Sequence, residues 1–309
     1  MRKYYKNGIS GLEITNNLNQ NCWISIESPT QEDKSFLLND LQIPEAFYND
    51  IEDIDERPRI EEENGWNLII IRIPYKSEDP KLPFTTIPLG LIFNSQHFVS
   101  VCFHKTEMLD DFIIYTQRKN LTVKDNFDLV LKLLLSSSIW YLKYLKQINQ
   151  RIKLAEDNLE KSIKNEELQA LLELEKCLVF FITSIKANDI LFHRIKNLKA
   201  EREYFDADLL EDVDIELKQA LEMSNIYSNI LTGMMDAYAS VISNNLNVIM
   251  KRLTSVSIIL MIPTLIASLY GMNVPNKLEN NPNGLLIIVV FSGVIAMIGA
   301  YLFKKKNLF

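Results

Sequence analysis

Two long runs near the C-terminal end of the chain contain no charged residue, and they constrain the fold more than any other feature. The runs are Leu253–Tyr270 and Leu285–Phe303. At about 1.5 Å per helical residue, each run approaches the roughly 30 Å of hydrocarbon in a bilayer. Two buried core helices are the alternative, but such long charge-free runs are more typical of membrane spans. We therefore expect two transmembrane helices.

The charges beside these runs predict the orientation of the spans. The loop between the spans, 271–284, holds only one lysine and one glutamate, whereas basic residues flank the other ends: Lys251, Arg252, Lys304, Lys305 and Lys306. The positive-inside rule then places both termini and the basic tail 304–309 in the cytosol, with the loop outside. The first ten residues lack the apolar core of a signal peptide. We expect a multi-pass protein of the cell (inner or plasma) membrane, with the lipid bilayer as a partner.

The segment before the first span predicts a single long helix. From 205 to 270 the chain has no proline before Pro263 and no glycine except Gly233. A helix of roughly 65 residues would be about 95 Å long, which suits a stalk that continues from a cytosolic domain into a bilayer. Pro263 should kink or soften this helix within the membrane.

A polar stripe runs along the predicted helix. Counting back from Gly271 in steps of three and four gives a series, with Leu253 beside it: Ser268, Thr264, Met261, Ser257, Thr254, Met250, Asn247, Ser243, Ser240 and Asp236. This period is that of a coiled-coil seam. Hydroxyls at this spacing can hold helices together. Because the stripe continues beyond the membrane run and ends at Asn273, we favour a conduit for ions over simple helix association. The neutral oxygens of the stripe suit a cation that keeps its water shell, as Mg²⁺ does. Two spans cannot enclose a pore, so several copies must assemble.

The first two thirds of the chain predict an α+β region followed by helices. Four runs rich in aromatic and β-branched residues are expected strands: "NCWISIES", "WNLIIIRIPY", "TTIPLGLIF" and "HFVSVCF". Asn39–Asp55 should form one helix or two short ones. We expect a cytosolic α/β domain over 1–122 and a helical hairpin over 123–204, with its turn in "NLEKSIKNEELQ". Leu129–Leu142 is too short for a span and contains Lys132.

Several function classes find no support in the sequence. The chain has a formal net charge of −7 and no basic aromatic patch, which argues against nucleic acid as a partner. No nucleophile–base pair, Walker loop or dinucleotide fingerprint appears, so we expect neither an enzyme nor an organic cofactor. The three cysteines lack metal-site spacing. His97 and His104 flank the last expected strand without a third histidine nearby, which favours packing or surface roles over zinc binding.

The C-terminal motifs resemble those of the CorA family of magnesium channels. "YGMN" at 270–273 follows "SNNLNVIMKRLT" and "IPTLIASLYGMN", and "ERPRIEEENGWNLIIIRI" is similar to the family's N-terminal strand region. The resemblance implies a homopentameric funnel that admits Mg²⁺, with some tolerance of Co²⁺ and Ni²⁺. It implies that Gly271, Met272 and Asn273 form the selectivity filter, with Asn273 facing a hydrated ion. It also implies constricting rings at Met250, Leu253 and Met261.

The resemblance further implies that Mg²⁺ is a regulator as well as the substrate. The family's regulatory ion lies between subunits, and its two aspartates fall on Asp50 and Asp212 of this chain. Neighbouring carboxylates at Asp53, Glu211 and Asp214 would add negative charge.

The loop after the motif departs from the family pattern. It reads "VPNKLENNPNG" and holds only Glu279 where many members have an acidic "MPEL"-like segment. The preferred metal among Mg²⁺, Co²⁺, Ni²⁺ and Zn²⁺ therefore stays open, since a related branch of the superfamily transports zinc. A membrane-anchored coiled-coil scaffold without transport is the other alternative, and in that case Asn273 would tolerate change.

Overall fold

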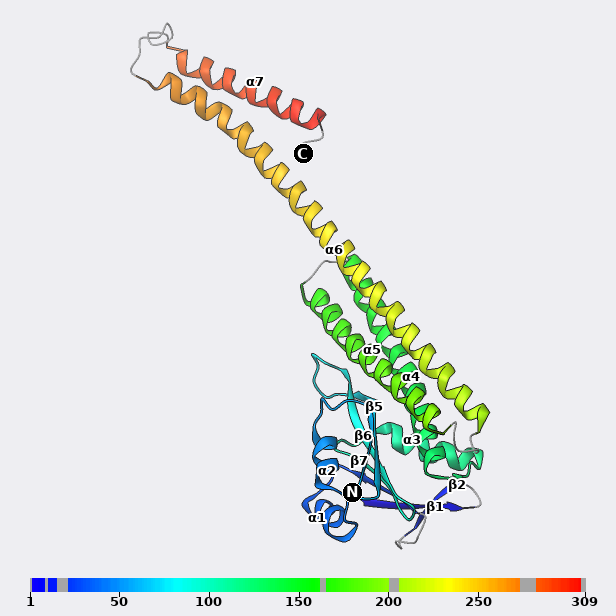
Figure 1. The fold of residues 1–309 in the computed structure, drawn as a ribbon. Coiled ribbons are helices and arrows are strands. Elements are labelled where there is room, and N and C mark those ends of the chain that lie inside the picture. The colour runs from blue at the N-terminus through cyan, green and yellow to red at the C-terminus, as the bar shows by residue number, and fades with distance from the viewer. Residues whose placement is uncertain are drawn as a thin grey trace. The chain divides into compact units, whose positions relative to one another are not determined.

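The chain folds into two compact units, residues 1–233 and 234–309. The computed structural model describes residues 2–8, 11–15, 22–161, 165–199, 206–272 and 282–306 (Figure 1). The first unit is an α/β structure, and the second contains the two apolar runs. Helix α6, Ala207–Tyr270, contributes residues to both units.

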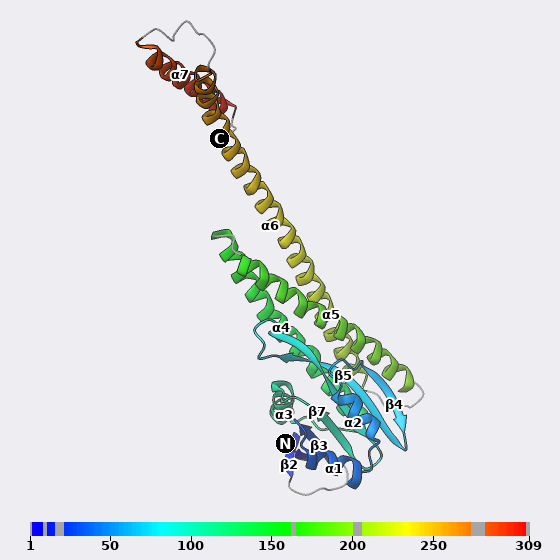
Figure 2. The same cartoon turned by 90° about the vertical axis from the view of Figure 1, so that its left-hand side faces the viewer.

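A seven-stranded mixed sheet forms the centre of the first unit (Figures 1 and 2). In the order β2-β1-β3-β7-β6-β5-β4, its strands are Gly11–Thr15, Arg2–Gly8, Trp23–Glu27, Phe98–Cys102, Phe84–Phe93, Trp66–Lys76 and Arg59–Glu63. Strands β3 and β7 run parallel, and the other ladders in the described part of the sheet are antiparallel. The four strands expected from aromatic and β-branched runs are confirmed as β3, β5, β6 and β7. Sequence reasoning missed β1 and β2.

Helices cover both faces of the sheet. The hairpin of α4 (Asn126–Lys161) and α5 (Asn165–Lys199) packs on β5 and β6, while α2 (Glu45–Glu52) packs on β6 and β7. This cover on both faces explains why β5 and β6 are almost continuously buried. Gly90 of β6 permits the close approach of α2, because a Cβ atom there would lie 2.1 Å from Cδ1 of Ile51.

The short helices of this unit agree in part with the sequence expectation. Within Asn39–Asp55, where one helix or two short ones were expected, the structure has α2 and the end of the π-helical turn η1 (Phe36–Asp40), and an unexpected helix α1 (Gln31–Ser35) precedes them. Helix α3, Glu107–Lys119, was not predicted. The expected turn of the hairpin at 162–164 lies outside the described residues. The boundaries expected at 122 and 204 stay predictions.

A buried polar junction joins the sheet to the hairpin. Asn188 of α5 accepts a hydrogen bond from the Arg72 main-chain N–H (2.9 Å) and donates one to the Arg72 carbonyl (2.7 Å). Strand β4 begins opposite Ile70, so Arg72 of β5 lies beyond its reach. The Asn188 amide therefore takes the place of a ladder partner. The Arg72 guanidinium donates to Thr86 and to the carbonyls of Ile54 and Glu56.

The second unit contains α7, Gly284–Lys305, and the C-terminal part of α6. The expected continuous helix is confirmed and includes Pro263. Both helices are long and apolar enough to cross a bilayer, and only 6% and 0% of the residues in their most apolar windows are buried. This exposure argues against buried core helices. Gly299 of α7 lies beside Ile262 of α6, consistent with small residues at helix contacts within membranes.

Replacing Asn188 with Ala should lower the free energy of unfolding of the first unit by about 2 kcal/mol, because the buried Arg72 N–H loses its acceptor. The three tryptophans of the chain all lie in the first unit, so tryptophan fluorescence during denaturation of the full chain in detergent reports on that unit. Asn229→Ala, at an exposed position of α6, is the control and should be nearly neutral. Equal midpoints for the two variants would contradict the role given to Asn188.

Candidate cation path and regulatory site

The predicted stripe lies on an exposed face of α6 in the single chain. The described members from Asp236 to Met272 are all exposed. The apolar side chains of Met250, Leu253 and Met261 are each more than half exposed. Exposed apolar area of this extent requires a cover of lipid or of further protein.

Two hydroxyl groups of the stripe, those of Ser257 and Thr264, are oriented as acceptors. Ser257 donates its hydroxyl hydrogen to the carbonyl of Leu253 (2.9 Å), and Thr264 donates to that of Leu260 (3.0 Å). With these hydrogens bound within the helix, the oxygen lone pairs point outward. A hydrated cation turns its water hydrogens outward, so such oxygens can accept from it. Ser255, the first-span hydroxyl outside the stripe, is buried instead.

One part of the stripe borders a hollow in the second unit. Asn247, Met250 and Thr254 line a cavity of about 320 Å³ together with Ser255 of α6 and Phe303 of α7. These three stripe residues therefore lie near the edge of the face that α7 covers.

The corner at the end of the first span is only partly described. Gly271 continues the helix by donating its N–H to the Ala267 carbonyl at 3.0 Å. Its backbone is not left-handed, and the chain forms a turn at Gly271 and a bend at Met272. Met272 is exposed. Asn273, the predicted ligand of a hydrated ion, lies outside the described residues.

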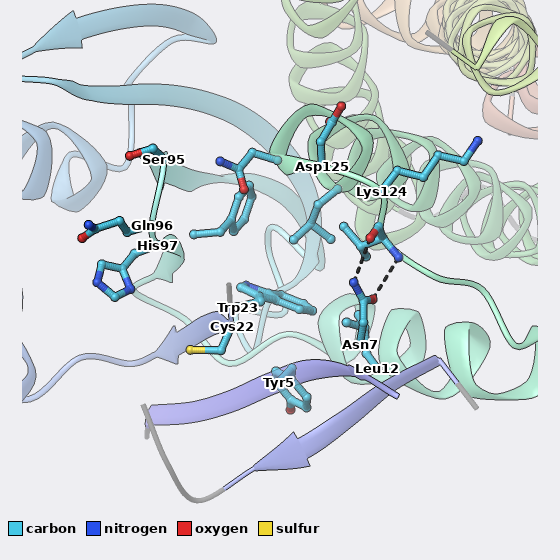
Figure 3. A pocket seen from close by; sticks show the side chains of 14 residues that line it. Tyr5, Asn7, Leu12, Cys22, Trp23, Ser95, Gln96, His97, Lys124 and Asp125 are labelled. Atoms are coloured by element: carbon cyan, nitrogen blue, oxygen red, sulfur yellow. Dashed lines mark hydrogen bonds between the residues drawn. The ribbon is translucent and has the colours of Figure 1, made fainter. Parts of the chain in front are cut away.

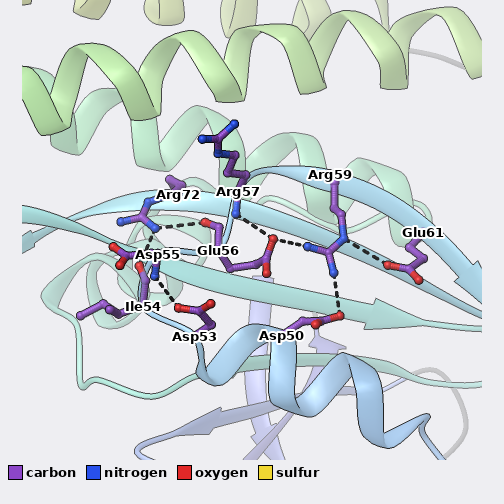
Figure 4. A network of polar contacts seen from close by, with 9 residues as sticks. All are labelled: Asp50, Asp53, Ile54, Asp55, Glu56, Arg57, Arg59, Glu61 and Arg72. Carbon is purple, nitrogen blue, oxygen red and sulfur yellow. Dashed lines mark hydrogen bonds and ion pairs between the residues drawn. The ribbon is translucent and has the colours of Figure 1, made fainter.

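Asp50, the first predicted regulatory aspartate, lies in an acidic network (Figure 4). Its carboxylate accepts a hydrogen bond from the Arg59 guanidinium at 2.6 Å. Arg59 also forms ion pairs with Glu56 and Glu61. Burial raises the pKa of the Asp50 carboxyl; Arg59 opposes this shift, and Glu56 and Glu61 add to it. Three carboxylates around one guanidinium leave a net negative charge, which favours a cation.

The second predicted aspartate has different surroundings. Asp212 is exposed near the start of α6, and it has no ion pair or hydrogen bond within the described part of the chain. The sequence led us to expect that its neighbour Asp214 would add negative charge. Asp214 instead forms an ion pair with Lys218 at 2.6 Å, which offsets that charge. Asp53 accepts from the Asp55 N–H at 3.0 Å.

The first unit also contains a cavity of about 360 Å³ (Figure 3). Trp23 and His97 line it, and Asn7 closes one side through two hydrogen bonds to the Val123 main chain (2.8 and 3.0 Å). None of the residues predicted to bind or conduct a cation lines this cavity. It therefore adds nothing to the candidate path.

The fold and the apolar helices define a two-span membrane protein with a large α/β unit before the spans. The chain belongs to the CorA-like Mg²⁺ transporter protein family, whose family model matches residues 19–305. The resemblance drawn from the C-terminal motifs is thereby confirmed.

Individual relatives match most of the chain. The cobalt/magnesium transport protein CorA of Methanocaldococcus jannaschii is 29% identical over 295 residues, which are 92% of this chain and 90% of the relative. The protein of the same name from Thermotoga maritima is 25% identical over 84% of this chain and 74% of its own length. The complete structure of the M. jannaschii CorA magnesium transporter aligns with a TM-score of 0.82 at 26% identity, covering 99% of this chain and 98% of the other.

Proposed function

We propose that this chain forms a homo-oligomeric channel, pentameric as the family resemblance implies, that admits Mg²⁺ to the cytosol and tolerates Co²⁺ and Ni²⁺. The observation that carries the proposal is the exposed polar stripe of α6, which continues into the largely apolar first span. Membership in a family of Mg²⁺ transporters and the magnesium and cobalt named for two relatives support the choice of cargo. Both termini are proposed to be cytosolic.

The stripe suits a cation that stays hydrated. Removing the water shell of Mg²⁺ would require charged ligands, and between Thr254 and Ser268 the stripe offers only neutral oxygens and a methionine. The outward lone pairs of Ser257 and Thr264 accept hydrogen bonds from the hydration shell. Asn273 is proposed to do the same at the outer end, where several copies would surround the ion. Asn247 and Asp236 then attract the ion as it leaves.

Membrane potential supplies the driving force. Moving two charges inward through about 100 mV releases about 4.6 kcal/mol, enough for more than a thousandfold accumulation. No nucleotide is needed. A conduit with this driving force would overfill the cell if it stayed open, so it requires a gate.

Two elements are proposed to form that gate. Rings of Met250, Leu253 and Met261 close the path by excluding water from a narrow apolar section. Mg²⁺ bound between subunits by Asp50 and Asp212 holds the closed, symmetric state. As cytosolic Mg²⁺ falls, the ion leaves, the carboxylates repel one another and the subunits separate.

Replacing Asn273 with Ala should reduce Mg²⁺ uptake by proteoliposomes to the protein-free level while leaving assembly intact, because the outer ring loses its carbonyl oxygens. A fluorescent Mg²⁺ indicator inside the liposomes measures uptake, and cross-linking measures assembly. Asn280→Ala, in the same loop but outside the motif, is the control. Normal uptake by Asn273→Ala would exclude the proposed filter.

Replacing Met261 with Ser should increase conductance at high cytosolic Mg²⁺ several-fold, because a hydroxyl ring wets the constriction. Val256→Ser is the matched control, since residue 256 lies on the opposite side of α6. Single-channel or bilayer currents measure the leak. If both variants conduct like the parent chain, the barrier lies elsewhere.

Replacing Asp50 and Asp212 together with Lys should weaken inhibition by cytosolic Mg²⁺, because cationic groups then stand where the ion would bind. A control pair, Glu52→Lys with Asp208→Lys, makes the same change of charge at exposed positions of the same two helices. Uptake is measured against internal Mg²⁺ for both. Unaltered inhibition by millimolar Mg²⁺ in the Asp50/Asp212 variant would refute this regulatory site.

A further inference from the structure

Three side chains of the kinds that bind metals meet between α5 and α6 in the first unit. Asp189 and His193 lie four residues apart on α5, and Asp214 lies on α6. One ligand atom from each residue lies within 4.8 Å of the others. Because residues two apart on a helix differ by about 200°, Asp214 and Asp212 point to different sides of α6. The cluster is therefore separate from the proposed regulatory pair.

Two oxygen atoms of this cluster lack hydrogen-bond donors. Oδ1 of Asp189 and Oδ1 of Asp214 are both buried, and neither has a hydrogen-bond partner in the part of the chain that the structure describes. Asp189 Oδ1 lies 3.6 Å from His193 Nε2, and the other oxygen of Asp214 accepts from Lys218. A buried carboxylate oxygen without a donor is destabilising, and a bound cation is one arrangement that satisfies it.

The spacing and the ligand types fit a transition metal. Residues four apart share one face of a helix, so Asp189 and His193 can bind one ion together. Ligands around a tetrahedral ion with bonds of about 2.1 Å lie about 3.4 Å apart, close to the observed 3.6 Å. An imidazole with two carboxylates suits Co²⁺, Ni²⁺ or Zn²⁺, whereas Mg²⁺ prefers oxygen ligands alone.

We propose that Asp189, His193 and Asp214 bind one divalent transition-metal ion, with water completing its coordination. Lys218 is largely exposed, so its ammonium group can turn into solvent as the ion approaches. The bound ion links the helical hairpin to α6, the helix that also contains the first apolar run. This site goes beyond the proposed transport function and does not depend on it.

A Co²⁺ titration of the metal-stripped full chain in detergent tests the site, with visible absorption as the readout and millimolar Mg²⁺ present throughout. The Asp50→Lys, Asp212→Lys chain serves as the parent, so that the proposed regulatory pair contributes no binding. We expect one Co²⁺ per chain to be lost, or bound at least about tenfold more weakly, when His193 is replaced with Gln. Asp189→Asn should have a similar effect.

His104→Gln is the matched control, because His104 lies against Tyr75 and away from the cluster; it should bind Co²⁺ like the parent. Unchanged tryptophan fluorescence would show that the first unit of each variant is folded. Equal stoichiometry and affinity for His193→Gln and the parent would overturn the site. Failure of the parent chain to bind Co²⁺ in the presence of the millimolar Mg²⁺ would also overturn it, since the site would then not prefer a transition metal. Transport is not measured, so failure here leaves the proposed channel untouched.

Discussion

The rest of this structure depends on one constraint. A helix that crosses the hydrocarbon of a bilayer carries a stripe of polar side chains. Bilayer hydrocarbon offers no hydrogen bonds, so hydroxyl and amide groups facing lipid are unfavourable. In the single chain the stripe from Asp236 to Met272 is exposed. Self-association would remove the stripe from lipid and, in a ring of more than two copies, would create a conduit lined by the same groups. The proposed assembly and the proposed permeation path thus rest on one feature.

In the proposed mechanism, the first unit connects cytosolic metal to this conduit. Asn188 replaces a missing ladder partner of Arg72, so the hairpin is bonded directly to the sheet. The acidic network around Asp50 lies near the same junction, because the Glu56 carbonyl accepts from Arg72 while its carboxylate pairs with Arg59. Helix α6 carries Asp212 and Asp214 and continues as the first apolar run. Metal bound at the sites proposed in the first unit would therefore contact the helix that is proposed to line the path.

The sequence predicted best the features that depend on local pattern. Length and absence of charge predicted both apolar helices, and the absence of proline and glycine predicted continuous α6. Strand β1 was missed because residues such as Lys3, Lys6 and Asn7 have little strand propensity. Pairing decides the conformation of both missed strands: β1 pairs with β3, and β2 pairs with β1. The junction at Arg72 joins residues distant in sequence, and the metal-type cluster adds Asp214 of α6 to the pair Asp189 and His193 of α5. Periodicity within one element cannot reveal such contacts between elements.

The central claim, that the assembled chain conducts Mg²⁺ along the electrical gradient, is tested most directly in liposomes. The purified protein is reconstituted with a fluorescent Mg²⁺ indicator inside, and a K⁺ gradient with valinomycin sets the membrane potential without nucleotide. The account predicts Mg²⁺ uptake that rises as the interior becomes more negative and that persists when a protonophore removes any proton gradient. Uptake no greater than that of protein-free liposomes at every potential would contradict it.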